Sequence, residues 1–341
     1  MTEDFELRLI DALQPVRGFV LAQVLHAAMR SELWDRLRDG ATGAEKLAAD
    51  LGLEPRRLTA VLGYLANEGF VVRGPDGYEL SVRGADITEF APWYRLLVGG
   101  YATTFQSIPL TLRAGAPYAE RDGTAVGQGS CGISAYDAIP LARSLLRQVP
   151  RPVDHLLDLG CGDGTVLLAL AADTPGAALT GVDPHPPSVD SARAAAARQG
   201  LAASFHQADG AAYVSARPPA VSGTACYLIA FTLQEILEQR GRPAVVDLVR
   251  DALRASTDAY LIVIEVDWKV NEPSVMRHGL GLAYYNPYYL IHALTEQRLE
   301  SREFWRAVAE DAGGTVLAVG EVDPHVDSTG LEFGFLIGHA R

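Results

Sequence analysis

The chain has 341 residues, 48% of them hydrophobic, which is enough for about two domains with cores of their own. Its formal net charge of −13 repels a phosphate backbone, so we expect no nucleic acid as partner. No apolar run approaches the roughly 18 residues of a membrane span, and we expect no membrane partner. The acidic N-terminus is unlike a signal peptide, and the three cysteines form no CxxC pair, so we expect a reduced, cytoplasmic protein.

The first third of the chain predicts helices followed by a hairpin. Apolar residues at three- and four-residue spacing indicate a helix over 16–37, and Thr42 with Glu45 forms a capping box that opens a short helix. A second short helix over 56–67 precedes two strands within 70–81, which are joined by a Gly-Pro-Asp-Gly turn. This order is typical of a winged helix.

Two interpretations of this winged helix, which we assign to residues 1–90, stay open. A DNA-reading domain needs several cationic or amide side chains along its recognition helix, whereas this helix has only Arg56 and Arg57, at its start. We therefore expect a homodimerisation domain. A regulator whose C-terminal part senses a ligand is the alternative from another class of protein.

The remainder of the chain predicts a connector and an α/β domain. Residues 91–150 are expected to form a helical connector that lines a cleft, with a glycine-rich segment at 123–132. Residues 151–341 show apolar strands that alternate with helices and end in a pair of strands. Strands that are hydrophobic on both faces indicate a doubly wound, mostly parallel sheet covered by helices on both sides.

The strongest sequence signal is a glycine loop, Asp158-Leu-Gly-Cys-Gly-Asp-Gly164, which follows a predicted strand and opens a helix. Gly160, Gly162 and Gly164 let the backbone turn tightly and approach a ligand closely. The glycines recur at every second position, unlike the G-x-G-x-x-G of dinucleotide sites. Asp163 inside the loop suits a cationic ligand better than a pyrophosphate.

Acidic residues also follow the next two predicted strands. Asp183 lies where it can accept hydrogen bonds from ribose hydroxyls, and Asp209, followed by Gly210, can accept from an adenine amino group. Each acid could instead be an ordinary turn or cap residue. Because the carboxyl ends of parallel strands meet at one crevice, the acidic positions together predict a nucleoside-binding site.

The glycine loop and the two acidic positions make residues 154–265 similar to the class I S-adenosylmethionine-dependent methyltransferases. The resemblance implies a Rossmann-like fold and S-adenosyl-L-methionine as cofactor. The loop would face the amino acid part of the cofactor, Asp183 its ribose and Asp209 its adenine. Gly210 and Phe231, which ends the fourth strand, are implied as further cofactor contacts. The whole chain resembles the small-molecule methyltransferases of secondary metabolism, which are commonly homodimers.

The segment after the fourth strand, Phe231-Thr-Leu-Gln-Glu-Ile-Leu237, bears on the acceptor. O-methyltransferases of this architecture have Val-Leu-His-x-Trp there, and they use a histidine after the fifth strand to deprotonate a phenol. Here Gln234 replaces the first histidine and Ile236 the tryptophan, while residues 266–269 contain no histidine. An O-methyltransferase of natural products is therefore the runner-up.

Gln234 and Glu235, together with the segment Met276–Arg298, resemble the 2-oxo acid C-methyltransferases, which include 2-ketoarginine and phenylpyruvate methyltransferases. The resemblance implies methyl transfer to C3 of a 2-oxo acid in the biosynthesis of a β-methylated amino acid for a peptide antibiotic. The best single guess for the acceptor is 2-ketoarginine (5-guanidino-2-oxopentanoate). Phenylpyruvate methyltransferase is metal-dependent with histidine ligands, one of which falls near Gln234.

The catalytic candidates follow from the chemistry of C3, which reacts only as an enolate. Making the enolate needs a base and something that stabilises charge on the keto oxygen. We expect Glu235 to be the base or a metal ligand, with Gln234 and Arg121 as further catalytic residues. A divalent or ferric ion would act as Lewis acid, with His292 and His278 as candidate ligands. Glu235 could instead be a first-turn residue that the helix dipole favours, and His292 could be a core histidine.

Two sets of charged residues are candidates for binding the acceptor. Three arginines could clamp its carboxylate, namely Arg121, Arg277 and Arg298. The guanidinium of 2-ketoarginine would need a carboxylate, and the sequence offers three without selecting among them, namely Asp137, Glu272 and Glu296.

Overall fold

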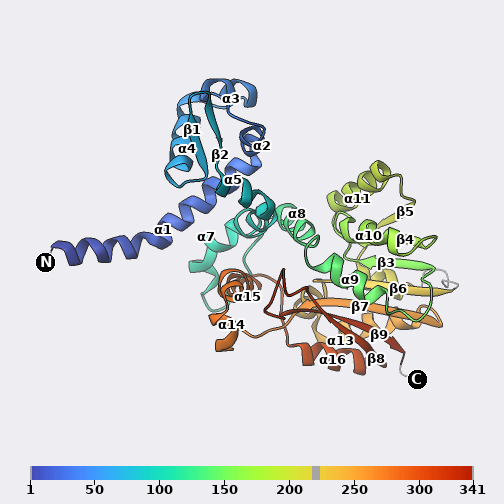
Figure 1. The fold of residues 1–341 in the computed structure, drawn as a ribbon. Coiled ribbons are helices and arrows are strands. Elements are labelled where there is room, and N and C mark those ends of the chain that lie inside the picture. The colour runs from blue at the N-terminus through green and yellow to red at the C-terminus, as the bar shows by residue number, and fades with distance from the viewer. Residues whose placement is uncertain (1, 217–222, 340–341) are drawn as a thin grey trace. The chain divides into compact units, whose positions relative to one another are not determined.

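The structure, a computed structural model, describes residues 2–216 and 223–339. The chain divides into two compact units, Met1–Ala102 and Thr103–Arg341 (Figure 1). Each unit has a hydrophobic core of its own. None of the helices in the described part of the chain combines the length and apolar character that crossing a bilayer requires.

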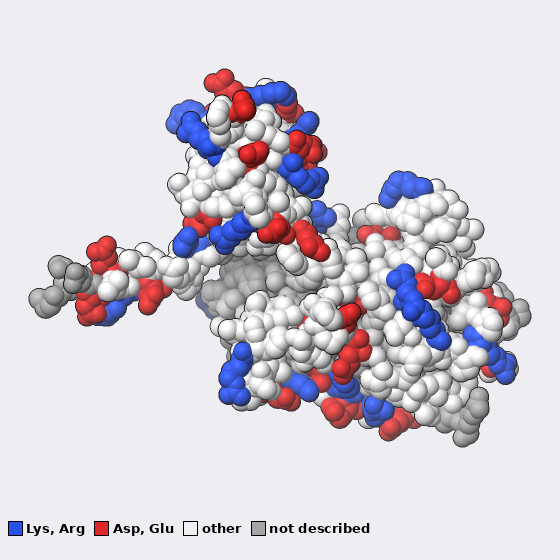
Figure 2. Space-filling model, viewed as in Figure 1, with Lys and Arg blue, Asp and Glu red and all other residues white. Residues whose placement is uncertain are grey.

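The first unit has the order of elements that the sequence predicts, helices followed by an antiparallel hairpin. They are α1 (Thr2–Arg30), α2 (Leu33–Arg38), α3 (Ala44–Leu51), α4 (Pro55–Asn67), β1 (Val71–Gly74) and β2 (Gly77–Leu80). Helix α4 begins after Glu54, whose carboxylate accepts hydrogen bonds from the backbone N–H groups of Arg56 and Arg57. On the face shown in Figure 2, acidic and basic side chains are interspersed over this unit.

The predicted capping box at Thr42 is wrong. Thr42 and Tyr78 exchange two backbone hydrogen bonds, with N–O distances of 3.0 and 2.9 Å, in a bridge next to the hairpin. Gly43 therefore takes the N-cap position of α3, without a side-chain hydrogen bond. Gly77 permits this bridge, because a Cβ there would lie 2.2 Å from the carbonyl carbon of Thr42.

The first unit extends past the boundary expected at residue 90. After β2 come α5 (Val82–Ile87), η1 (Thr88–Phe90), α6 (Ala91–Tyr94) and η2 (Arg95–Gly100). Tyr94 packs against the core of the first unit, and the indole N–H of Trp34 donates to Thr88 at 2.8 Å. The start of the expected connector therefore belongs to the first unit, while the chain from Thr103 on belongs with the sheet.

The second unit is built on a seven-stranded sheet of order β5-β4-β3-β6-β7-β9-β8. Its strands are β3 (His155–Leu159), β4 (Ala178–Asp183), β5 (Ala203–Gln207), β6 (Thr224–Ala230), β7 (Asp258–Val266), β8 (Gly314–Glu321) and β9 (Glu332–His339). Strands β3 to β7 are parallel, whereas β9 is antiparallel to both β7 and β8. The predicted doubly wound, mostly parallel sheet is confirmed.

Helices cover both faces of this sheet (Figure 1). One core cluster contains apolar residues of α9 (Ala138–Leu146), α10 (Thr165–Leu170) and α11 (Pro186–Gln199). The opposite cluster contains those of α12 (Gly210–Ser215), α13 (Leu233–Arg254) and α16 (Arg302–Asp311). The strand order reverses between β3 and β6, so a ligand crevice is expected at the carboxyl ends of these strands.

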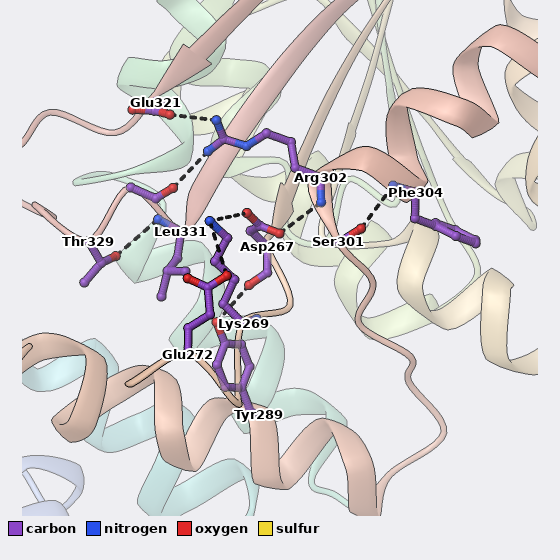
Figure 3. Close-up of polar contacts among 11 residues, drawn as sticks. Asp267, Lys269, Glu272, Tyr289, Ser301, Arg302, Phe304, Glu321, Thr329 and Leu331 are labelled. Atoms are coloured by element: carbon purple, nitrogen blue, oxygen red, sulfur yellow. Dashed lines mark hydrogen bonds and ion pairs between the residues drawn. The ribbon is translucent and has the colours of Figure 1, made fainter. Parts of the chain in front are cut away.

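The segment after β7 is fixed by a network of polar contacts around Asp267 (Figure 3). The Asp267 carboxylate accepts from the backbone N–H of Arg302 at 2.9 Å and pairs with the ammonium of Lys269 at 3.3 Å. The hydroxyl of Tyr289 donates to the Asp267 carbonyl at 2.8 Å. These contacts tie helix α15 (Asn286–Leu294) to the end of the sheet. The elements α14 (Pro273–Arg277) and η4 (Gly281–Tyr285) precede α15.

Candidate active site

The glycine loop between β3 and α10 has a backbone conformation that only glycine adopts easily. The φ angles of Gly160, Gly162 and Gly164 are 87°, 54° and 80°, all in the left-handed region. At Gly160 the space is closed as well, because a Cβ there would lie 2.4 Å from Oγ1 of Thr232. The loop backbone therefore packs directly against the residues that precede α13.

Two carboxylates lie against this loop. Asp183 accepts hydrogen bonds from the backbone N–H groups of Gly162, at 3.0 Å, and His185, at 2.8 Å. Asp158 on β3 is only 3% exposed, and its burial, followed by the charge of Asp183, raises its pKa to about 7. A cation bound at the loop would be stabilised by both acids.

Asp209 has partners that the sequence did not indicate. Its carboxylate caps α12 by accepting from the N–H of Ala212 at 2.9 Å, and it binds both guanidinium nitrogens of Arg240, at 2.6 and 3.1 Å. The bond to Arg240 lowers the pKa of Asp209. Arg240 lies further along α13, and only the fold brings it to the end of β5.

A pocket of about 90 Å³ opens beside these residues. It is lined by Leu159, Gly160, Pro184, Asp209, Gly210, Ile229, Thr232, Glu235, Ile236, Gln239, Arg240 and Leu248. Three of the expected cofactor residues and one catalytic candidate, Glu235, thus share one pocket.

The turn between β6 and α13 positions the catalytic candidates. Phe231 has a φ angle of 55°, which is unusual for a residue other than glycine. Its N–H donates to the Ile264 carbonyl at 2.9 Å, and the N–H of Leu233 donates to the buried carboxyl of Glu265 at 3.1 Å. Burial raises the pKa of Glu265 to about 8. These bonds determine where Gln234 and Glu235 begin the helix.

Gln234 and His292 form a buried pair, and these two residues are only 2% and 3% exposed. The distance between Gln234 Nε2 and His292 Nε2 is 3.2 Å, and His292 Nδ1 lies 2.7 Å from the Tyr288 carbonyl. A carbonyl can only accept, so Nδ1 donates and Nε2 accepts from the Gln234 amide. Burial, and to a smaller extent the charge of Arg121, lower the pKa of His292 to about 3, so its imidazole is neutral.

Glu235 lies between two donors from distant parts of the chain. Its Oε1 accepts from Arg121 at 2.5 Å and from the amide of Gln297 at 3.1 Å. The structure therefore brings Arg121 and Glu235 together, two residues that the sequence proposed separately. Gln297 was missed, because no spacing in the sequence relates it to α13.

The other candidates lie apart from this group. Nε2 of His278 is 3.0 Å from the hydroxyl of Ser328, and its Nδ1 accepts backbone N–H bonds from Leu280 and Gly281. The guanidinium of Arg298 pairs with Glu300 at 2.7 Å. The two imidazoles, His278 and His292, therefore have separate sets of partners.

A metal ion does not fit these donors as they lie. Among residues 2–216 and 223–339, no three His, Cys, Asp or Glu side chains are grouped so that they could hold an ion. His292 Nε2 accepts from an amide, and Glu235 faces a guanidinium whose charge opposes a second cation.

The comparisons with known proteins identify the family. A family model described as a methyltransferase domain matches residues 156–256. The chain is 49% identical over 338 residues to a 2-ketoarginine methyltransferase of Streptomyces arginensis, covering 99% of this chain and 98% of the relative. The chain belongs to the S-adenosylmethionine-dependent methyltransferases. Its cofactor is S-adenosyl-L-methionine, as the glycine loop and the strand-end acids predict.

A second relative of this methyltransferase and a solved structure are more distant. An indolepyruvate C-methyltransferase of Streptomyces griseus is 28% identical over 307 residues, covering 86% of this chain and 87% of the relative. The structure of a mitomycin 7-O-methyltransferase superposes with a TM-score of 0.71 at 18% identity and covers 100% of both chains. The latter likeness shows the shared fold.

We expect the affinity of the methyltransferase for S-adenosylhomocysteine to increase about tenfold between pH 6 and pH 8. Asp158, with its pKa of about 7, is protonated at the lower pH and becomes a carboxylate that attracts the ligand's ammonium at the higher. The same raised pKa makes the ligand-free protein less stable as the pH rises from 3.8 towards 7, because the folded state holds the proton more tightly than the unfolded state does. Calorimetry at several pH values measures the affinity. Asp158→Asn should flatten the profile; an unchanged slope in that variant would assign the titration to another group.

Proposed function

We propose that the methyltransferase transfers the methyl group to C3 of a 2-oxo acid, and that the acceptor is 2-ketoarginine. The observation on which this depends is the 49% identity, across 99% of the chain, to a 2-ketoarginine methyltransferase. The distant likeness to an indolepyruvate C-methyltransferase supports the same class of acceptor.

The residues after β7 favour carbon over a phenolic oxygen as the acceptor atom. An enzyme that methylates a phenol needs a base beside the hydroxyl. Asp267 is the carboxylate of this segment, but it is 2% exposed and both its oxygens are bound, one to Arg302 and one to Lys269. It holds the local structure together and is unsuited to take a proton from an acceptor.

Glu235 is the residue that we assign to the proton transfer. Its carboxylate lines the pocket, and both contacts described above end on Oε1, so Oε2 takes the proton. The C3–H electrons form the C2=C3 double bond as negative charge moves to the keto oxygen. The cofactor supplies an electrophilic methyl group. C3 then forms a bond to that carbon as its bond to sulfur breaks, which leaves S-adenosylhomocysteine and a protonated Glu235.

A buried acidic cluster is our candidate for the guanidinium end of the acceptor. Of the three carboxylates that the sequence offered, Asp137 is buried, whereas Glu272 and Glu296 are exposed. Asp137 hydrogen-bonds to Glu332, and burial raises the pKa of both groups, that of Asp137 to about 7. Oε1 of Glu332 is buried and has no hydrogen-bond partner among the described residues. A guanidinium would supply both the missing donor and the missing charge.

Aromatic side chains connect this cluster to the Gln234–His292 pair. The hydroxyl of Tyr285 donates to Asp327, whose charge also acts on Asp137. The rings of Tyr285 and Tyr288 are 6.3 Å apart between centroids, and those of Tyr288 and His292 are 4.0 Å apart. These ring contacts link the cluster to the buried pair, and an acceptor bound along the tyrosines would have its two ends near the two places.

Glu332→Gln should lower kcat/KM for 2-ketoarginine by about 10- to 100-fold, which corresponds to one lost hydrogen bond between charged groups. It should change the value for 2-oxohexanoate, which has no cation, by less than about twofold. Steady-state kinetics with the two acceptors provide the comparison, and the uncharged acceptor controls for misfolding. An equal loss with both would place the guanidinium elsewhere.

The direct test of the proposed function is incubation with methyl-labelled S-adenosylmethionine and a panel of 2-oxo acids and phenols. We expect the label in 2-ketoarginine at C3, located by mass spectrometry and NMR. Labelled phenol, with no labelled 2-oxo acid, would instead identify an O-methyltransferase.

We also propose that the methyltransferase is a homodimer formed through α1. This helix projects from the rest of the first unit (Figure 1) and has a row of apolar side chains that are 40% to 65% exposed. They are Phe5, Leu7, Leu9, Ile10, Leu13, Val16, Phe19 and Val20. An apolar row of this length on one helix is typical of a surface that a second copy covers.

The double variant Phe5→Glu/Phe19→Glu should shift the protein from dimer to monomer, because each charge would be buried in the interface without a partner. Light scattering after gel filtration measures the mass. Arg8→Glu, an exposed change on the same helix, is the matched control and should remain dimeric. A monomeric parent protein would contradict the proposal outright.

A further inference from the structure

A cation that the chain itself supplies, the guanidinium of Arg121, lies near the Gln234–His292 pair and Glu235. Glu235 accepts from the guanidinium of Arg121 at 2.5 Å, and the charge of that guanidinium also acts on His292. Arg121 and Glu235 are partly covered, with side-chain exposures of 26% and 31%. The charge of Arg121 therefore already acts on two residues that a metal site would use, Glu235 and His292.

The lone pair with which His292 could bind an ion is already engaged. Its Nδ1–H donates to the Tyr288 carbonyl, so Nε2 has the lone pair that a metal would need. That lone pair accepts from the Gln234 amide nitrogen at 3.2 Å. The amide cannot be turned over without cost, because Nε2 of Gln234 also donates to the Phe231 carbonyl at 3.2 Å. Turning it would place an oxygen against two acceptors.

The Gln234 carbonyl oxygen is a second observation at the same place. Oε1 is buried and has no hydrogen-bond partner among the described residues, although Gln234 is only 2% exposed. An unmet buried acceptor is costly, and it is satisfied when a bound molecule brings a donor. This unmet oxygen marks the side of the buried pair on which a ligand would bind.

We infer that Arg121, and not a metal ion, supplies the positive charge that stabilises the enolate of the acceptor. The inference rests on the proposed function, since it concerns the same 2-oxo acid. A guanidinium fork spans two oxygens in one plane, and the C1 carboxylate and C2 keto oxygen of a 2-oxo acid offer such a pair. A chelated metal would contact the same two oxygens.

The test begins with the full-length enzyme dialysed against EDTA. We expect substoichiometric metal by elemental analysis, an unchanged rate of methyl transfer to 2-ketoarginine, and no site-specific heat on titration with Mn²⁺, Fe²⁺ or Zn²⁺. Loss of activity on chelation, restored by one equivalent of metal, would overturn the inference and leave the proposed function standing. So would a stoichiometric heat that disappears in His292→Ala.

The charge itself is tested by substitution. Arg121→Gln should lower the rate of transfer by about 10²- to 10³-fold, as the loss of one oxyanion-stabilising donor does, while S-adenosylhomocysteine still binds. Arg121→Lys should retain only part of the rate of transfer, because an ammonium cannot span both oxygens. Arg147→Gln, a change at an exposed arginine paired with Asp173, is the matched control. Full activity of Arg121→Gln would overturn the inference. If no 2-oxo acid is methylated at all, the proposed function fails, and the metal titration still decides whether the site binds an ion.

Discussion

Glu235→Gln is expected to lower the rate of methyl transfer by about 10²- to 10⁴-fold while cofactor binding is retained. The amide keeps the size of the side chain and can still accept from Arg121 and Gln297 through its oxygen. It cannot take a proton from C3. The specific measurement is the exchange of the C3 protons of the acceptor with D₂O in the presence of S-adenosylhomocysteine, followed by NMR, because this isolates deprotonation from transfer.

Glu238→Gln is the matched control for that experiment. Glu238 lies one turn along the same helix, and its carboxylate accepts from the hydroxyl of Tyr118. We expect exchange and transfer within about twofold of the parent rate, the scatter usual for a substitution remote from the chemistry. Undiminished exchange in Glu235→Gln would assign the base to another residue.

Gly160→Ala is expected to abolish measurable binding of S-adenosylhomocysteine in calorimetry. The new Cβ would lie 2.4 Å from Thr232 Oγ1, and the residue would have to keep a φ angle of 87°. The steric overlap must be relieved by moving either the loop or the start of α13, and both line the pocket. The left-handed backbone alone costs about 1–2 kcal/mol for alanine.

The double variant Gly160→Ala/Thr232→Ala separates the two effects. Removing Oγ1 and Cγ2 of Thr232 leaves its Cβ at 3.3 Å, a tight but tolerable contact, so part of the binding should return. The backbone cost remains, and recovery should stop about tenfold short of the parent affinity. Circular dichroism controls for folding. Normal binding by the single variant would mean that the loop adjusts elsewhere.

The architecture of the second unit could be predicted because each strand has its own signal. The runs over β6 and β7 are apolar on both faces, and residues of that kind are stable only in a sheet covered on both sides. The misplaced cap at Thr42 shows the limit of such reasoning. The local signal was sound, but two backbone bonds to Tyr78, distant in sequence, replaced it. The first compact unit ends at Ala102, and the packing of Tyr94 against its core is likewise a contact that local sequence does not encode.

Site residues that directly follow a strand could be predicted from the sequence. Contacts between residues of separate segments could not. Asp183 and Asp209 could be placed by their strands, whereas the bond from Arg240 to Asp209 depends on how α13 packs. The Gln234–His292 pair joins residues 58 positions apart and arises only when α15 folds back against the end of the sheet. No spacing in the sequence encodes that return.

The backbone at Phe231 sets the thermal stability of this enzyme against its catalytic activity. A non-glycine residue with a φ angle of 55° is strained, and a glycine there would adopt this angle without strain, at the expense of more entropy in the unfolded chain. Yet the same corner sets the direction in which the first turn of α13 presents its polar groups. A substitution that lets this corner relax to another φ angle would therefore reorient Gln234 and Glu235, whatever it adds to the melting temperature.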